Sequence, residues 1–154
     1  MRWSARGIGA ACAIAAYVVD QVSKGAAIAF FAQLEAGIEI LPVFNLVLIR
    51  NRGVSFGLMN GLPWWALAFL GLAIVTVLSV WLWRARSRLS GAAIGLIIGG
   101  ALGNIADRIR WGGVTDFLDF HIDEYHWPAF NFADVAIVSG VGLLLLQRPK
   151  PHST

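Results

Sequence analysis

Four long apolar stretches constrain the fold of this chain more than any other feature of its sequence. They cover about residues 7–31, 62–83, 89–106 and 130–146 of 154. A helix needs about 17 to 25 residues to cross roughly 30 Å of hydrocarbon, and each stretch is near that length. Only 14% of the residues are charged, against about a quarter in a soluble domain. We therefore predict an all-α membrane protein with four transmembrane helices in a single domain, residues 1–154.

The basic residues predict the direction of the four spans. Seven of them precede the first span, join the second to the third, or follow the fourth: Arg2, Arg6, Arg84, Arg86, Arg88, Arg148 and Lys150. The nine acidic residues all fall in or near the other side. Because basic residues favour the cytoplasmic face, both termini are predicted to be cytoplasmic. The net charge of +3 is thus a topology signal, and no nucleic-acid partner is expected.

Two loops are predicted to face away from the cytoplasm. The first, about residues 32–61, contains a β-branched and aromatic run at 43–49, which predicts a small β-rich element at the membrane interface. The second, about 107–129, mixes aromatic and acidic residues, which is typical of a short amphipathic segment on the membrane surface. Asp119 is expected on the polar face of that segment.

Polar residues gather at one depth, just beneath the outer interface. A helix rises about 1.5 Å per residue, so Asp20 and Asp134 each lie about 21 Å from the basic residue nearest the cytoplasmic side. Ionisable groups at such depth are costly and are candidates for function. Asp20 has a local partner in Lys24, four residues on, whereas Asp134 has no basic residue after it until Arg148.

Two carboxylates favour hydrolytic chemistry over the alternatives. The serines have no neighbouring base in sequence, and the spacing of His121 and His126 lacks the helical geometry of a zinc-protease site, so neither a serine triad nor a metal is expected. Two acids a few Å apart hold one proton between them. One carboxylate then activates water, while the protonated one polarises a scissile carbonyl.

Five motifs occur in a fixed order along the chain. They are DQVSK (20–24), NRGVSFG (51–57), GGALGNIADR (99–108), VTDF (114–117) and FNFAD (130–134). In this order on a four-span chain they closely resemble lipoprotein signal peptidase, the type II signal peptidase of bacteria. The resemblance implies an intramembrane aspartic endopeptidase of the bacterial cytoplasmic (inner) membrane. Its substrate would be a diacylglyceryl-modified prolipoprotein, cut before the lipidated cysteine, with no cofactor.

The resemblance also implies roles for individual residues. The catalytic pair would be Asp116 and Asp134, and Asp107 would be a support that pairs with an arginine. The other supporting or substrate-binding residues fall into three groups: Asn104 and Asn131 would orient the carboxylates, Arg108 would contact a carbonyl or lipid headgroup, and Asp20, Lys24, Asn51 and Gly53 would shape the substrate groove. Membrane lipids are expected partners, and one chain carries every group that the mechanism needs, so activity as a monomer is expected.

Other readings remain open at this point. Asp107 is a rival to Asp116 as the second catalytic acid, because it lies in an equally distinctive motif. A transporter would use Asp20, Asp107 and Asp134 as a proton or cation relay, but few polar residues continue toward the cytoplasmic side. A non-enzymatic membrane adaptor would leave the buried acids without a purpose.

Overall fold

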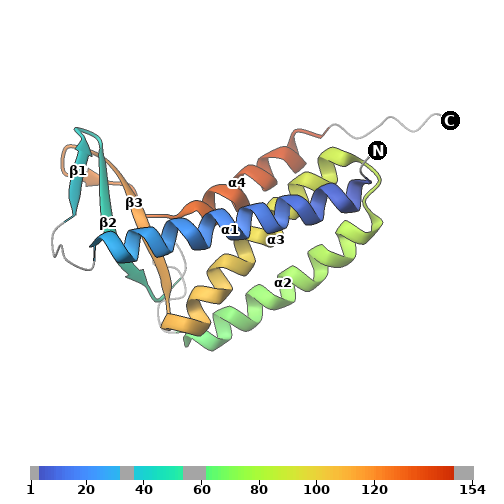
Figure 1. The fold of residues 1–154 in the computed structure, drawn as a ribbon, viewed down its shortest axis with the longest axis horizontal. Coiled ribbons are helices and arrows are strands. Elements are labelled where there is room, and N and C mark those ends of the chain that lie inside the picture. The colour runs from blue at the N-terminus through green and yellow to red at the C-terminus, as the bar shows by residue number, and fades with distance from the viewer. Residues whose placement is uncertain (1–3, 32–36, 54–61, 148–154) are drawn as a thin grey trace.

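Helices and a small antiparallel sheet make up the part of the chain that the computed structural model describes, residues 4–31, 37–53 and 62–147. Its helices are α1 (Ala5–Phe31), α2 (Trp64–Arg84), α3 (Arg88–Trp111) and α4 (Phe132–Leu145). Its strands are β1 (Ile38–Leu41), β2 (Phe44–Asn51), β3 (Val114–Ile122) and β4 (Tyr125–His126). Helix α3 packs against α1, α2 and α4, and the sheet lies at one end of the helices (Figure 1).

Three of the helices are long and apolar enough to cross a membrane: α1, α2 and α3. The first three predicted spans are therefore present, with α3 continuing past the predicted end at 106 to Trp111. Helix α4 has only 14 residues, which gives a length of about 21 Å. That is shorter than the hydrocarbon core. The fourth crossing over 130–146 thus stays a prediction.

The basic residues of the helices gather at the end opposite the sheet. Arg6 lies in the first turn of α1, Arg84 ends α2 and Arg88 begins α3, and Figure 1 shows these three helix ends together with the end of α4. Arg6 also joins two helices, because its guanidinium lies 4.4 Å from the Trp83 ring centroid and donates to the Trp83 carbonyl at 2.8 Å. The charge asymmetry of the sequence therefore separates the two ends of the folded molecule.

Small residues bring α3 into backbone contact with α1. Glycines recur every fourth residue on α3, and a Cβ at Gly91, Gly95 or Gly99 would meet the backbone of α1. This small-residue stripe is typical of close helix packing in membranes. At Gly103, the last glycine of the stripe, a Cβ would instead meet the Asp20 carboxylate. The missing side chain therefore makes room for a buried acid.

The second outward loop differs from its prediction. Instead of an amphipathic surface segment, α3 ends at Gly112, whose φ of 69° is left-handed, and the chain continues into β3. Strand β3 pairs with β2 in a sheet of order β1-β2-β3-β4. The predicted β-rich element of the first loop is present as β1 and β2. The prediction for the second loop was wrong because residues 114–117 are buried, so no exposed face marks the strand.

Candidate active site

Asp116 and Asp134 reach the same place from different elements. Asp116 lies in β3, four residues after the glycine that ends α3. Asp134 lies in the first turn of α4, where Asn131 is the N-cap. The Asn131 side-chain oxygen accepts from the Asp134 backbone N–H at 3.1 Å, and the Asn131 backbone N–H donates to Asp134 Oδ2 at 3.2 Å. This capping box starts the helix and fixes the Asp134 carboxylate.

Three asparagine amides hold the two carboxylates. Asn131 Nδ2 donates to Asp116 Oδ1 at 2.7 Å, and Asn51 Nδ2 donates to Asp116 Oδ2 at 3.0 Å. Asn104 Nδ2 donates to Asp134 Oδ1 at 3.0 Å. A further bond of 3.3 Å runs from Asn131 Nδ2 to Asn104 Oδ1. Asn131 therefore contacts both acids, and Asn104 and Asn131 lie where carboxylate orienters were predicted to lie.

Burial gives Asp116 an unusual proton affinity. Burial, together with the nearby charge of Asp134, raises the pKa of this carboxyl from 3.8 to about 6. The hydrogen bonds from Asn51 and Asn131 and the charge of Lys24 act in the opposite direction. The charge of Asp134 thus affects the pKa of Asp116, as expected of two carboxylates that share one site.

A cavity of about 270 Å³ opens onto both acids. Its polar lining consists of Asn51, Asn104, Arg108, Asp116 and Asp134, and its apolar lining comes mainly from α2 and α3. Arg108 donates to the Gly53 carbonyl at 3.1 Å and to the Asn104 carbonyl at 3.3 Å. Its buried Nε has no partner among the described residues. The guanidinium thus offers one more donor beside the acids.

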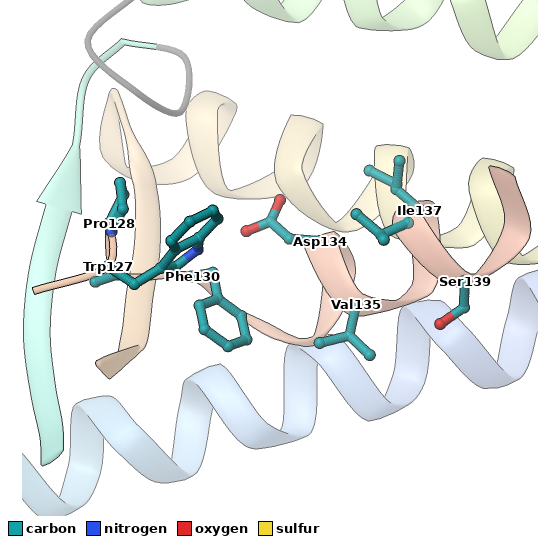
Figure 2. A pocket seen from close by; sticks show the side chains of 9 residues that line it. Trp127, Pro128, Phe130, Asp134, Val135, Ile137 and Ser139 are labelled. Carbon is teal, nitrogen blue, oxygen red and sulfur yellow. The ribbon is translucent and has the colours of Figure 1, made fainter. Parts of the chain in front are cut away.

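A second cavity, of about 540 Å³, lies on another side of Asp134. Figure 2 shows the side chains of Trp127 and Phe130 on one side of Asp134, and those of Val135, Ile137 and Ser139 along α4. Both cavities share Asp134 and Ile137. Asp134 therefore lines both cavities; the first, which also contains Asn51, Asn104, Arg108 and Asp116, is called the polar cavity below, and the second the apolar cavity.

Asp20 and Lys24 lie behind the acids rather than in the polar cavity. Both are almost completely buried, with exposed fractions of 0% and 2%, and their predicted i, i+4 ion pair is present at 2.9 Å. Neither is part of the lining of the cavity, so a part for them in shaping the substrate groove stays a prediction. Asn51 does line it, and the Gly53 amide donates to Asn51 Oδ1 at 3.0 Å.

Asp107 also differs from its prediction. It was expected to pair with an arginine, but its ion-pair partner is Lys24, at 3.4 Å. Its Oδ2 accepts the Thr115 amide at 2.8 Å. Asp107 is buried and is absent from the lining of both cavities that contain Asp134. The fold therefore brings Asp116, and not Asp107, to the cavity wall with Asp134.

Asp119 was predicted on an exposed polar face, and this was wrong. It is 6% exposed, and it accepts from Asn45 Nδ2 at 3.2 Å and lies 2.9 Å from His126 Nδ1. The rings of His121 and His126 stack with centroids 4.8 Å apart. Within the described ranges, no three His, Cys, Asp or Glu side chains are grouped to hold a metal ion.

Sequence reasoning missed several contacts of the site. Asn51 was assigned to the substrate groove, yet its amide binds Asp116. Gln21 and the Thr115 amide were not predicted at all, and both contact Asp107. Gln21 lies in the motif DQVSK and Thr115 in the motif VTDF, so the motifs were a signal for the importance of both residues. Their partners lie too far along the chain to be read from spacing.

Comparisons with known proteins agree with this architecture. A family model described as signal peptidase (SPase) II matches residues 12–148. The lipoprotein signal peptidase of Beijerinckia indica subsp. indica is 43% identical over 148 residues, which is 94% of this chain and 89% of that protein. That of Methylorubrum extorquens is 48% identical over 119 residues, 74% of this chain and 70% of the relative.

Two solved structures have the same fold. Both are described as bacterial membrane enzymes solved by the in meso method, at 2.3 and 1.9 Å resolution. The first has a TM-score of 0.79 at 30% identity, covering 91% of this chain and 86% of that chain. The second has a TM-score of 0.77 at 30% identity, covering 93% and 95%. The predicted resemblance is confirmed, and the chain belongs to the signal peptidase II family.

Proposed function

We propose that this protein is an intramembrane aspartic endopeptidase that removes the signal peptide from diacylglyceryl-modified prolipoproteins, cutting before the lipidated cysteine. The observation that carries the proposal is the pair Asp116 and Asp134, both bound to Asn131 and both at the wall of one cavity. Membership of a peptidase family whose curated relatives are lipoprotein signal peptidases supports the substrate class.

The proton of the resting pair belongs on Asp116. Burial raises the pKa of Asp116 to about 6, so the proposal places the proton there, while the Asp134 carboxylate accepts hydrogen bonds from the Asn104 side-chain amide and the Asn131 backbone N–H. Ionised Asp134 takes a proton from a water molecule as its oxygen attacks the scissile carbonyl carbon. Protonated Asp116 donates a hydrogen bond to the carbonyl oxygen, where negative charge develops.

The tetrahedral intermediate then breaks down by the reverse use of the same groups. The carbonyl re-forms and the C–N bond breaks, and the proton now on Asp134 passes to the leaving amine of the cysteine. Asn131 keeps the two carboxylates in register throughout, because it is bonded to each of them. These proton transfers need only the two acids and one water molecule.

The two cavities suit a substrate with apolar parts on both sides of the scissile bond. The polar cavity places Arg108 beside the acids, where its unpaired Nε can bind a peptide carbonyl or a lipid headgroup oxygen. The apolar cavity along α4 has Asp134 in its lining (Figure 2). In this proposal the apolar signal peptide and its lipid occupy these two cavities beside the acids.

The chain acts as one peptidase domain, residues 1–154, in the bacterial inner membrane. Both termini are cytoplasmic, and the acids lie near the outer interface, at the end of the helices away from Arg6, Arg84 and Arg88. The α4 helix completes a fourth crossing. A monomer suffices, because a single chain supplies both acids and all three asparagines.

Cleavage of a diacylglyceryl-modified prolipoprotein peptide in detergent or lipid tests this proposal. We expect wild-type protein to cleave it, and Asp116→Asn and Asp134→Asn each to lose about 1,000-fold or more in kcat. Asp107→Asn is the matched control, because it removes a buried acid that lies off the cavity wall, and it should retain measurable activity. An inactive Asp107→Asn with an active Asp116→Asn would reject this pair, and an inactive wild type would return the relay function to consideration.

A further inference from the structure

A buried ion cluster of Asp20, Lys24 and Asp107 lies directly behind the two candidate catalytic acids. The Lys24 ammonium is 2.9 Å from Asp20 Oδ2 and 3.4 Å from Asp107 Oδ2. It also donates to Asn104 Oδ1 at 2.9 Å. An ammonium has three donor hydrogens, and Lys24 thus has an oxygen partner for each of them. This cluster, the Lys24 cluster below, joins α1 to α3 in the interior.

Each acid of the Lys24 cluster holds the backbone beside one catalytic acid. Asp20 Oδ1 accepts the amide of Ala133, the residue before Asp134, at 3.0 Å. Asp107 Oδ2 accepts the amide of Thr115, the residue before Asp116, at 2.8 Å. The two hydrogen bonds are equivalent, although one runs to a helix and the other to a strand. Lys24 pairs with both Asp20 and Asp107 and is therefore linked to the backbone at both catalytic positions.

The third contact of Lys24 acts on a side chain. Asn104 Oδ1 accepts from Lys24, so the amide must present its Nδ2 hydrogens on the other side, where Asp134 Oδ1 accepts at 3.0 Å. A reversed amide would place its NH2 group against the ammonium and its oxygen against a carboxylate, and both contacts would be repulsive. The positive charge of Lys24 thus fixes the orientation of Asn104 toward Asp134.

From these contacts we propose that Lys24 is a positioning residue for catalysis, which sets the spacing and hydrogen bonding of Asp116 and Asp134 through Asp20, Asp107 and Asn104. This inference rests on the proposed function, since it presumes that these two acids catalyse the reaction. Lys24 itself is 2% exposed and does not line the cavity that holds both acids. It acts without touching substrate.

The cluster is closed from the outside by Gln21. Its Nε2 donates to Asp20 Oδ2 at 3.1 Å and to Asp107 Oδ1 at 3.3 Å, and its Oε1 accepts from Arg110 at 2.7 Å. Lys24 is the one basic residue among the contacts of Asp20 and Asp107 in this cluster. The removal of Lys24 would make the local charge more negative.

Lys24→Met separates a positioning role from a structural one. Methionine has similar length and no charge, so substrate contacts at the cavity stay unchanged while the three oxygen partners lose their donor. Misplacement of catalytic groups by about 1 Å costs up to about 100-fold, so we expect kcat to fall about 10- to 100-fold with KM within about twofold of wild type. Ser23→Ala is the control on the same helix, because its hydroxyl donates to the Asp20 carbonyl at 2.9 Å, and it should keep wild-type kcat.

The pH profile supplies a second readout. Besides Lys24, the charged groups around Asp116 are Asp134, Arg108, Asp107 and Asp20, and Lys24 lowers the pKa of Asp116. Lys24→Met removes that effect, so the alkaline limb of kcat/KM should move to higher pH. The double variant Lys24→Met, Asp107→Asn removes one charge of each sign. This double variant should shift the alkaline limb of kcat/KM back toward its wild-type pH, while kcat stays low.

Folding is measured in the same samples by thermal unfolding in detergent. If Lys24→Met does not fold, Asp107→Asn carries the test, because its amide oxygen still accepts from Thr115 while its bond to Lys24 loses a charge. It should then lower kcat with KM unchanged. Folded Lys24→Met with wild-type kcat and pH limb, or Asp107→Asn with wild-type kcat, would overturn the inference. If wild type cleaves and Asp116→Asn and Asp134→Asn do not, either result leaves the proposed function standing.

Discussion

At the scale of single residues, Asn131 performs two tasks with one side chain. Its oxygen accepts the Asp134 amide and starts α4, and its Nδ2 donates to Asp116 at 2.7 Å. The same contact therefore fixes a helix end and the geometry of the candidate catalytic pair. Asparagine suits both tasks because its amide carries a donor and an acceptor, whereas aspartate at this position would place a third carboxylate beside the pair.

Asp116 should be held at a cost to stability, and Asp116→Asn tests this. Its pKa of about 6 lies above the value of 3.8 for a free side chain. A raised carboxyl pKa means that the folded state binds the proton more tightly, so this contribution to stability is complete below about pH 4 and is lost as pH rises through about 6. At pH 8 the raised pKa of Asp116 corresponds to a destabilisation of about 3 kcal/mol. The side-chain amide of Asp116→Asn would lose one of the hydrogen bonds that the carboxylate accepts, worth about 1 kcal/mol.

We therefore expect Asp116→Asn to be more stable than wild type by about 2 kcal/mol at pH 8, and no more stable at pH 4. Unfolding by detergent or heat at the two pH values measures this difference. Glu124→Gln is the control, because this acid is exposed and its replacement should leave stability nearly unchanged at both pH values. A stability difference that is the same at pH 4 and pH 8 would contradict the assignment of the raised pKa to Asp116.

At the scale of elements, the α1–α3 contact places the Lys24 cluster. Glycines every four residues on α3 let the two helices touch along their backbones, and at Gly103, the last of them, the space is filled by the Asp20 carboxylate. Helix packing and acid placement are thus one feature of the sequence. A side chain on this stripe would separate Asp20 from Ala133 and from Lys24 at once.

Gly103→Ala should disturb this element contact and the site together. Its Cβ would meet the Asp20 carboxylate, whereas a Cβ at Gly142 on α4 has no atom within 4 Å. Overpacking of an interior costs about 1 to 3 kcal/mol, so Gly103→Ala should lower stability by about this amount and reduce kcat. Gly142→Ala, the matched control, should be neutral or slightly stabilising in the same unfolding and cleavage measurements. Equal behaviour of the two variants would show that the space at Gly103 is not needed.

At the scale of the whole molecule, charge and structure divide the protein into two ends. Arg6, Arg84 and Arg88 lie at one end of the helices, and the sheet with the candidate acids lies at the other (Figure 1). By the positive-inside rule we expect the basic end to face the cytoplasm. With that orientation, the proposed function requires the signal peptide to reach the candidate acids at the other end of the helices.

Labelling of single cysteines tests this orientation and the fourth crossing. In a Cys12→Ala background, an impermeant thiol reagent applied to intact cells should label Glu124→Cys at the sheet end. It should label Arg86→Cys and Gln147→Cys only after the membrane is made permeable, because both lie at the opposite end of the helices. Labelling of Gln147→Cys in intact cells would show that α4 does not cross.

The sequence by itself determined the membrane class, the charge asymmetry, the i, i+4 pair of Asp20 and Lys24 and the motifs that carry the family. These signals are local or compositional, so no contact map is needed to read them. Only the tertiary structure decided that β3 is a strand, that Asn51 binds Asp116 across 65 residues and that Asp107 pairs with Lys24. It also joined Asp20 to Ala133 across 113 residues. A buried polar group takes as partner whichever donor or acceptor the packing brings near, and helix spacing and strand alternation carry no information about such distant partners.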